Sequence, residues 1–218
     1  MYLAGRGLSS LQDSITRLKT TYPDLSTSNL HPLELDLSSI ATSVAGAKSF
    51  LEPRLDILIA NAGIALDNNT ALSSDGWERH FQTNHLGHFA FITTLLPLVE
   101  DTAKEYGEAR IAVVASDGYT FVNGIDFDAI RKEVPPNMLG FTGGMKRYGQ
   151  SKLANILFAL EIARRLRERG VENVWVNAVH PGEITLLHFV GLVLIRWKVR
   201  LSLPALEVPD SSLGFLHL

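Results

Sequence analysis

The stretch DILIANAG, residues 56–63, joins a short aliphatic run to a polar turn. Residues 57–60 are all apolar, so the strand that they predict would be buried on both faces between layers of helices. Asn61-Ala62-Gly63 follows at the carboxyl end of this strand, and open parallel sheets bind their ligands at that end. The stretch therefore predicts a central strand of a parallel sheet that leads into a ligand-binding turn.

Similar aliphatic runs alternate with helical patterns along the chain. The predicted strands lie at 2–4, 33–37, 56–60, 111–115 and 174–179. The predicted helices lie at about 8–22, 39–50, 77–105 and 148–169. We expect 56–60 and 111–115 to be central strands. The alternation predicts an α/β fold, a doubly wound parallel sheet, and we expect residues 1–218 to form a single domain.

The composition of the chain excludes several classes of function. A net charge of -3 and a pI near 6.2 disfavour a nucleic-acid-binding surface, because such surfaces are basic. The absence of cysteine excludes disulfides and thiolate chemistry. The first residues lack the basic and apolar pattern of a secretory signal, so we expect a cytoplasmic protein.

An apolar segment lies near the end of the sequence, at 184–195, and three basic residues follow it at 196, 198 and 200. A membrane-spanning helix needs about 20 apolar residues, so this segment is too short to cross a bilayer. We expect a lid over a substrate, with weak attachment to a membrane surface as the alternative.

Tyr148 and Lys152 are the first candidates for chemistry. Their i, i+4 spacing on a predicted helix places both side chains on one face, about 6 Å apart. A positive charge at this distance favours the phenolate and lowers the pKa of the tyrosine, so the pair can exchange a proton with a substrate. Because this spacing also arises by chance, the prediction depends on the residues nearby.

Three further polar residues are expected near this pair. Asn61 and Ser116 each follow a buried strand, at the same edge of the predicted sheet. Asn84 lies inside a predicted helix, where asparagine is unfavourable unless its amide has a partner. In the alternative interpretation, Ser116 caps a helix, Asn61 forms a turn and Asn84 is an exposed polar residue. The occurrence of all three residues together favours a functional site near Tyr148 and Lys152.

At this point the sequence resembles a known family. Roughly residues 1–185 are similar to the short-chain dehydrogenase/reductase superfamily, and within it to the retinol-dehydrogenase-like branch. The run YGQSKLAN at 148–155 is especially close to that branch. The motifs, in order, are Asp36-Leu37, Asn61-Ala62-Gly63, FQTNHLGHF at 81–89, Ser116, Tyr148 to Lys152, and Pro181-Gly182.

The resemblance implies a role for each of four residues in the reaction. Tyr148 would be the general acid and base toward a carbonyl or alcohol oxygen. Lys152 would lower the pKa of Tyr148 and hold the nicotinamide ribose. Ser116 would hydrogen-bond the reacting oxygen, and Asn84 would support a proton-relay water. The hydride would come from the cofactor.

The resemblance also implies a set of cofactor contacts. Asp36 and Leu37 would contact the adenine, the Asn61-Ala62-Gly63 turn would contact the adjacent ribose, and Ile184 with Thr185 would contact the nicotinamide amide. Arg6 follows a strand at the place where an NAD enzyme offers a carboxylate, and a guanidinium there suits a 2′-phosphate. We therefore expect NADP in preference to NAD, unless Arg6 is an ordinary exposed turn residue.

His85 and His88 are spaced as metal ligands could be, at i and i+3. No third ligand stands at a suitable spacing, and the family has these histidines without a metal. We therefore expect no metal.

Two features depart from the family pattern. The glycine-rich turn that binds the pyrophosphate has no counterpart in the sequence, so we expect a Rossmann-like sheet that lacks its first strand and this turn. The segment Pro181 to Thr185 is one residue shorter than the family pattern. We expect residues 186–218 to form a divergent lid or tail.

These observations lead to one main hypothesis and two alternatives. The main hypothesis is an NADP-dependent oxidoreductase that interconverts a carbonyl and an alcohol on a hydrophobic small molecule, such as a secondary metabolite or a lipid-like substrate. One alternative is a truncated, non-catalytic remnant that acts through protein contacts. The other is a wrongly assigned start codon. By analogy with the family, a homo-oligomer is expected.

Overall fold

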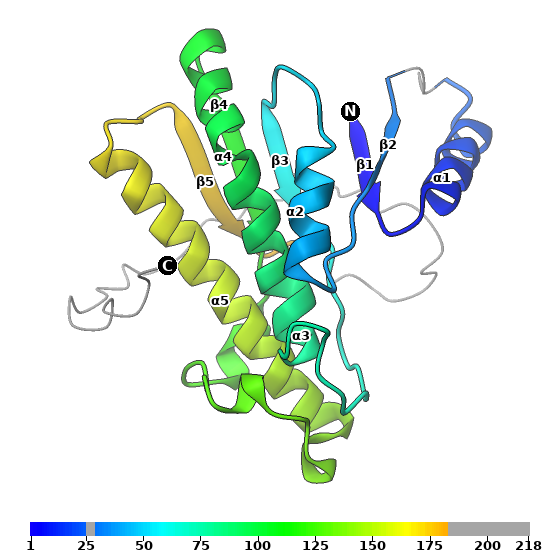
Figure 1. The fold of residues 1–218 in the computed structure, drawn as a ribbon, viewed down its shortest axis with the longest axis vertical. Coiled ribbons are helices and arrows are strands. Elements are labelled where there is room, and N and C mark those ends of the chain that lie inside the picture. Colours follow the sequence, from blue (N-terminus) through cyan, green and yellow to red (C-terminus); the bar gives the residue numbers. More distant parts are fainter. Residues whose placement is uncertain (25–28, 183–218) are drawn as a thin grey trace.

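The computed structural model describes residues 1–24 and 29–182, which form an α/β fold in which every strand pairing is parallel (Figure 1). The strands are β1 (Tyr2–Gly5), β2 (His31–Glu34), β3 (Ile57–Ala60), β4 (Ala109–Val114) and β5 (Val174–Val179). Among the described residues they form two sheets, β1-β2 and β3-β4-β5. This arrangement confirms the predicted Rossmann-like fold without its first strand.

The helices pack against these sheets through a shared hydrophobic core. The main helices are α1 (Leu8–Thr21), α2 (Ile40–Lys48), α4 (Gly87–Tyr106) and α5 (Gly140–Glu168). Ile92, Val99 and Leu166 are buried against Ile111 and Val113 of β4 in the largest apolar cluster. Helix α1 packs instead on β1 and β2, where Ile15 and Leu18 form a small cluster with Leu30. No helix in the described part of the chain is both long and apolar enough to span a bilayer.

The helix expected over 77–105 is interrupted. A short helix α3 (Arg79–Phe81) is followed by one π-helical stretch (Gln82–Leu86) before α4 begins. Apolar spacing alone cannot reveal such a change, because a π-turn adds one residue to a helix without altering its general pattern. The interruption matters because Asn84 lies inside it.

Helix α5 begins at Gly140, well before the expected start at Tyr148. The segment GFTGGMKR at 140–147 contains three glycines, which lower helix propensity, so sequence reasoning places it in a loop. Two of these glycines allow close packing. A Cβ on Gly143 would lie 2.0 Å from the carbonyl oxygen of Met138, so only glycine fits there.

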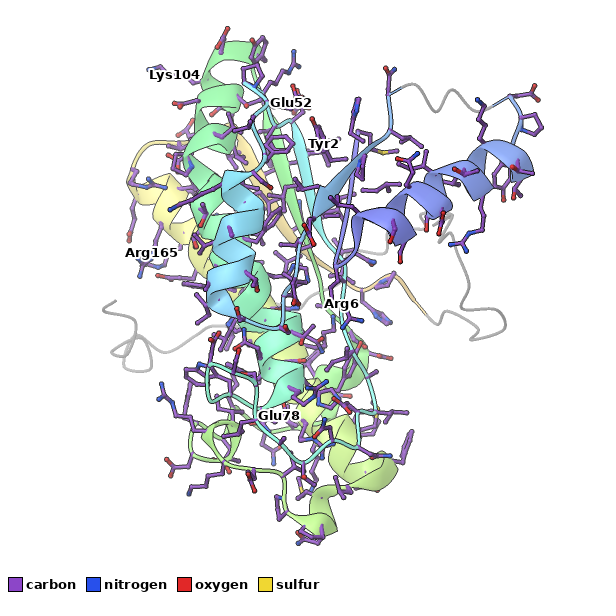
Figure 2. All side chains as sticks on the ribbon, turned by 45° about the vertical axis from the view of Figure 1, so that its right-hand side comes forward. Tyr2, Arg6, Glu52, Glu78, Lys104 and Arg165 are labelled. Carbon is purple, nitrogen blue, oxygen red and sulfur yellow. The ribbon has the colours of Figure 1, made fainter. Side chains whose placement is uncertain are left out.

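Strand β3 is an edge strand in the described structure, which corrects the prediction that it is central. Ile57 is 60% exposed and Ile59 is 50% exposed, whereas Ile111 and Val113 of β4 are fully buried. The reason is that β1, the next strand beyond β3, is not hydrogen-bonded to it. Tyr2 of β1 instead contacts the loop between α2 and β3: its ring packs edge-on against Phe50, and its hydroxyl hydrogen-bonds to Glu52 (Figure 2).

Candidate active site

The carboxyl ends of β1, β3 and β4 carry predicted site residues. Arg6 follows β1 and is exposed (Figure 2). Asn61 follows β3 and is exposed, and Ser116 follows β4 and is half-buried. Ser116 also caps the short 3-10 helix Asp117–Phe121, because its Oγ accepts a hydrogen bond of 3.1 Å from the Gly118 N–H. The cap and the site are therefore not competing interpretations of Ser116.

Tyr148 lies on α5 beside the end of β4. Its ring packs against Gly118, where an added Cβ would lie 3.1 Å from ring carbons. Burial raises the pKa of the phenol, the hydrogen bond with Ser116 lowers it, and the charge of Asp117 raises it, so that the net pKa is above its ordinary value. The structure therefore brings Tyr148 and Ser116 together, as predicted, and keeps the phenol protonated at neutral pH.

Lys152 is buried at the base of the site, with its Nζ 5.5 Å from the centre of the Tyr148 ring. The ammonium donates a hydrogen bond of 2.9 Å to the carbonyl of Val114, and burial lowers its pKa to about 8. The expected lowering of the tyrosine pKa is not seen in this structure, because burial of the phenol is the largest influence and raises the pKa.

Asn84 lies fully buried in the π-helical stretch, which excludes the exposed alternative. Its Oδ1 accepts from the Ile64 N–H over 2.7 Å, and its Nδ2 donates to the Ile64 carbonyl over 2.9 Å and to Ser151 Oγ over 3.0 Å. The amide thus fastens the turn after β3 to α5. A Cβ on Gly63 would lie 2.9 Å from this Oδ1, so the turn requires glycine.

The predicted cofactor residues lie in different surroundings. Asp36 is half-buried and accepts from the Ser38 N–H through Oδ1. The Leu37 side chain is buried in the core, so this residue can offer a ligand only its backbone. Ala62 and Gly63 are exposed. Ile184 and Thr185, together with the predicted lid at 186–218, lie outside the described residues.

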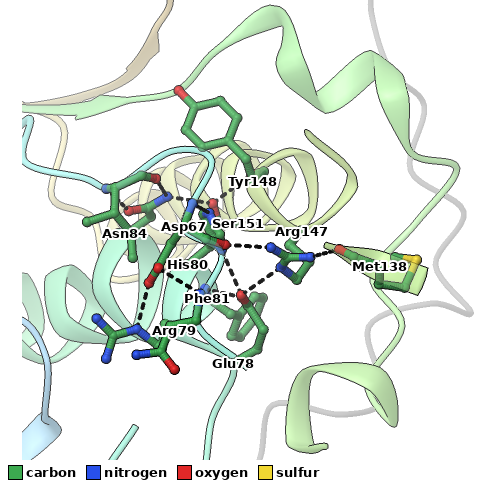
Figure 3. A network of polar contacts seen from close by, with 12 residues as sticks. Asp67, Glu78, Arg79, His80, Phe81, Asn84, Met138, Arg147, Tyr148 and Ser151 are labelled. Atoms are coloured by element: carbon green, nitrogen blue, oxygen red, sulfur yellow. Dashed lines mark hydrogen bonds and ion pairs between the residues drawn. The ribbon is translucent and has the colours of Figure 1, made fainter. Parts of the chain in front are cut away.

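A buried polar network beside α5 was not predicted from the sequence (Figure 3). Glu78 accepts a 2.7 Å hydrogen bond from His80 Nδ1, and its Oε1 lies 3.2 Å from Arg147 Nε. Burial alone would raise the pKa of Glu78, but the hydrogen bond and charge of His80 and the Phe81 N–H hold it below its usual value. Arg147 also donates to the carbonyls of Met138 and Asp67.

The two histidines considered as metal ligands have other partners. His85 donates from Nδ1 to Asn155 Oδ1 over 3.2 Å, and His88 donates from Nε2 to the Ala62 carbonyl over 2.7 Å. Burial lowers the pKa of His88 to about 4, so it stays neutral at physiological pH. His88 thus supports the turn after β3.

Comparison with known proteins agrees with this arrangement. Residues 5–123 match the model of the short chain dehydrogenase family. The chain is 39% identical over 188 residues to the short-chain dehydrogenase TIC 32 A, chloroplastic, of Brassica napus, covering 84% of the chain and 55% of the relative. It is 43% identical over 151 residues to retinol dehydrogenase 14 of Homo sapiens, covering 68% of the chain and 40% of the relative. The chain thus spans about half the length of the curated relatives it matches.

A solved structure shows the same fold. The RhlG/NADP active-site complex of Pseudomonas aeruginosa has a TM-score of 0.60 and 27% sequence identity, covering 84% of this chain and 62% of the other. Together with the family match over residues 5–123 and the similarity to retinol dehydrogenase 14, it leads to one assignment. The chain belongs to the short chain dehydrogenase family, in its retinol-dehydrogenase-like branch.

Proposed function

We propose that this protein is an NADP-dependent oxidoreductase that interconverts a carbonyl and an alcohol on a hydrophobic small molecule. The observation that carries the proposal is the Tyr148 phenol, packed on Gly118 beside Ser116, with the buried Lys152 ammonium below it. A protonated phenol beside a serine hydroxyl can bind a carbonyl oxygen and then deliver a proton to it.

The chain's own residues would handle the reacting oxygen and its proton. In carbonyl reduction, Ser116 and Tyr148 would both donate hydrogen bonds to the oxygen, and Tyr148 would transfer its proton as the alcohol forms. The raised pKa of Tyr148 supports this acid role at neutral pH. The Ser116 hydroxyl would turn away from Asp117 Oδ1, to which it donates over 3.1 Å in the described structure. Bound NADPH would supply the hydride.

The described residues fit parts of the cofactor. One of the three ammonium donors of Lys152 is used by Val114, which leaves donors for ribose hydroxyls. Arg6 is exposed next to the N-terminus of α1, where Gly7 provides no side-chain cap. A guanidinium beside free helix N–H groups suits a 2′-phosphate, so we propose NADP in preference to NAD. The described residues contain no glycine-rich turn that would bind the pyrophosphate, so the affinity for NADPH is the first quantity to measure.

A two-part experiment tests the proposal. Fluorescence titration with NADPH is expected to give micromolar binding, and Arg6→Gln is expected to weaken NADPH binding about tenfold with little effect on NADH, since it removes one charge-assisted contact. Absence of NADPH binding would support the alternative of a non-catalytic remnant.

Turnover is measured as NADPH oxidation with a panel of ketones and aldehydes. Tyr148→Phe removes the proton donor and is expected to lower kcat at least a hundredfold. Tyr106→Phe, an exposed tyrosine on α4, is the matched control and is expected to retain full activity. Equal rates for the Tyr148→Phe variant and the unaltered protein would refute the role of Tyr148.

The cytoplasmic location, the weak membrane contact and the homo-oligomer expected from the sequence are further proposals. Cell fractionation, vesicle sedimentation and light scattering of the purified chain are the measurements that test them.

A further inference from the structure

Leu66 has an unusual backbone conformation for a leucine. Its φ is +55°, and no other non-glycine residue of the described ranges has a positive φ. A branched side chain is strained in this left-handed region, because its Cβ approaches the following carbonyl. Such a conformation persists only where the surrounding structure enforces it, and it is enriched at functional sites. The surroundings of Leu66 therefore need an explanation.

The next residue, Asp67, is held from three directions (Figure 3). Its N–H donates to His80 Nε2 over 3.2 Å, and its carbonyl accepts from Arg147 Nη2 over 2.7 Å. Its carboxylate accepts from Arg79 Nε over 2.6 Å. His80 and Arg147 are themselves buried against Glu78. The network fixes the peptide after Leu66 and so enforces the conformation of Leu66.

The Leu66 side chain lies on Gly144 of α5. A Cβ on Gly144 would lie 3.1 Å from Leu66 Cδ2 and 3.4 Å from Leu66 Cα, so the glycine makes room for the leucine. Gly144 stands one helical turn before Tyr148 on the same face, and helical side chains lean toward the N-terminus of their helix. Leu66 thus packs one helical turn before Tyr148 on this face of α5, and the residue remains 44% exposed.

Phe141 extends this apolar surface. It lies seven residues before Tyr148, which again places it on the same face of α5, and it is 68% exposed. Phe141 and Tyr148 thus share a face of α5 with Gly144, on which Leu66 packs. Exposed apolar side chains arranged in this way suit an apolar ligand whose polar end reaches the phenol.

We propose that Leu66 is a specificity-determining residue that contacts the apolar part of the substrate, and that the network around Asp67 holds it in place. The ligand class is a ketone, aldehyde or alcohol on a saturated carbon chain or ring, in which the oxygen lies at Tyr148. The proposal rests on the proposed function, because it takes Tyr148 as the reacting end.

Binding of two ketones tests the proposal without requiring turnover. The probes are 2-decanone, which has a long apolar chain, and 2-butanone, which does not, and their affinities are measured by saturation-transfer difference NMR on the 218-residue protein. Leu66→Asn and Leu66→Gly are expected to weaken 2-decanone binding about tenfold and to change 2-butanone binding less than twofold, since the lost methyl groups contact only the longer chain. Leu160→Asn is the control, because Leu160 on α5 is also 44% exposed.

The variants also separate loss of contact from unfolding. Leu66→Gly is expected to raise the Tm while weakening 2-decanone binding, because glycine adopts a positive φ without strain. Gly144→Ala is expected to displace Leu66 and so to weaken 2-decanone binding as the Leu66 variants do. In turnover, the Leu66 variants are expected to raise KM for long-chain ketones and leave kcat within twofold, because Leu66 does not touch the reacting oxygen.

Each outcome gives a decision. The inference is overturned if the Leu66 variants bind 2-decanone as tightly as the unaltered protein, or if the unaltered protein binds neither ketone or both equally. If the unaltered protein binds 2-decanone through Leu66 but oxidises no NADPH with any ketone, the proposed reaction fails while the role of Leu66 in binding stands.

Discussion

Asn84 and Ser151 are joined by a hydrogen bond of 3.0 Å from Nδ2 to Oγ, which ties the π-helical stretch to α5. Ser151 in turn donates to the carbonyl of Tyr148 over 2.7 Å. The turn after β3, the π-helical stretch and the helix that carries Tyr148 therefore meet at one buried amide. Removal of the Asn84 amide should therefore disturb the turn after β3, the π-helical stretch and α5.

Asn84→Ala leaves the Ile64 N–H and carbonyl without their partner and removes one of the two partners of the Ser151 hydroxyl. Because Ser151 is buried and Ile64 is half-buried, we expect the free energy of unfolding to fall by about 2–4 kcal/mol. Urea denaturation measures the change, with the exposed Asn123→Ala as control. Equal stabilities of the two variants would contradict the assigned role.

Gly149→Ala tests the contact between α5 and the turn after β4. Alanine normally stabilises a helix interior by about 1 kcal/mol relative to glycine. Here a Cβ would lie 2.5 Å from the carbonyl oxygen of Gly118, so backbone must move and we expect a net loss of about 1–3 kcal/mol. Gly124→Ala, where a Cβ meets nothing within 4 Å, should lack this loss in thermal denaturation.

Glu78 and Arg147 form a buried ion pair. The losses in the free energy of unfolding from removing each partner should therefore not be additive. We expect Glu78→Gln to destabilise the protein by about 3–5 kcal/mol, because it leaves the buried Arg147 guanidinium without a carboxylate. Arg147→Met should cost about 1–3 kcal/mol, because Glu78 keeps its hydrogen bond from His80 while the Met138 and Asp67 carbonyls lose their donor. The double variant should be less destabilised than the sum of the two. A double-mutant cycle in urea measures the coupling.

The Arg164 side chain on α5, which is 41% exposed where it pairs with Glu161, provides the comparison. Exposed ion pairs are screened by solvent and contribute little, so Arg164→Met should change the stability much less than Arg147→Met. Similar losses for both arginine variants would show that burial of the Glu78 pair has no special effect.

Lys152 should make the stability depend on pH. Its pKa in the folded protein is about 8, below the ordinary value of 10.5, so the unfolded chain binds more protons between these values. The penalty for burying the ammonium is fully present below pH 8 and is relieved as pH rises to 10.5. The unaltered protein should gain about 3 kcal/mol over this window relative to Lys152→Met, if the pKa shift acts in full.

Urea denaturation at several pH values between 7 and 10.5 measures this difference. The exposed Lys146→Met is the control for general effects of charge, because Lys146 lies on the same helix. A constant difference between the unaltered protein and Lys152→Met across the window would contradict the lowered pKa.

Several parts of the site could be predicted because they depend on local spacing. The i, i+4 relation of Tyr148 and Lys152 follows from helix geometry, and the placement of Asn61 and Ser116 follows from the parallel direction of the strands. The sign of the Tyr148 pKa shift could not be predicted in this way. It depends on burial and on Lys152 turning toward Val114, which are properties of the packed structure.

Other parts depend on contacts between distant segments. Glu78 and Arg147 are far apart in the sequence, and neither residue type indicates a buried position by itself. The early start of α5 also depends on tertiary contacts. The glycines at 143 and 144 lower helix propensity, but they allow contacts with Met138 and Leu66. The sequence shows the charged residues and the glycines themselves. It does not show which distant residues they contact.

The separation of β1 from β3 has a consequence for the dynamics of the folded protein. Helix α1 contributes only to the small cluster around Ile15 and Leu18, whereas β2 reaches the large cluster through Leu33 and β4 lies at its centre. Regions with few buried contacts open locally at lower free energy than the core. Native-state hydrogen exchange should therefore show α1 opening as a separate cooperative unit before β4 loses protection, and Arg6 lies just before this helix.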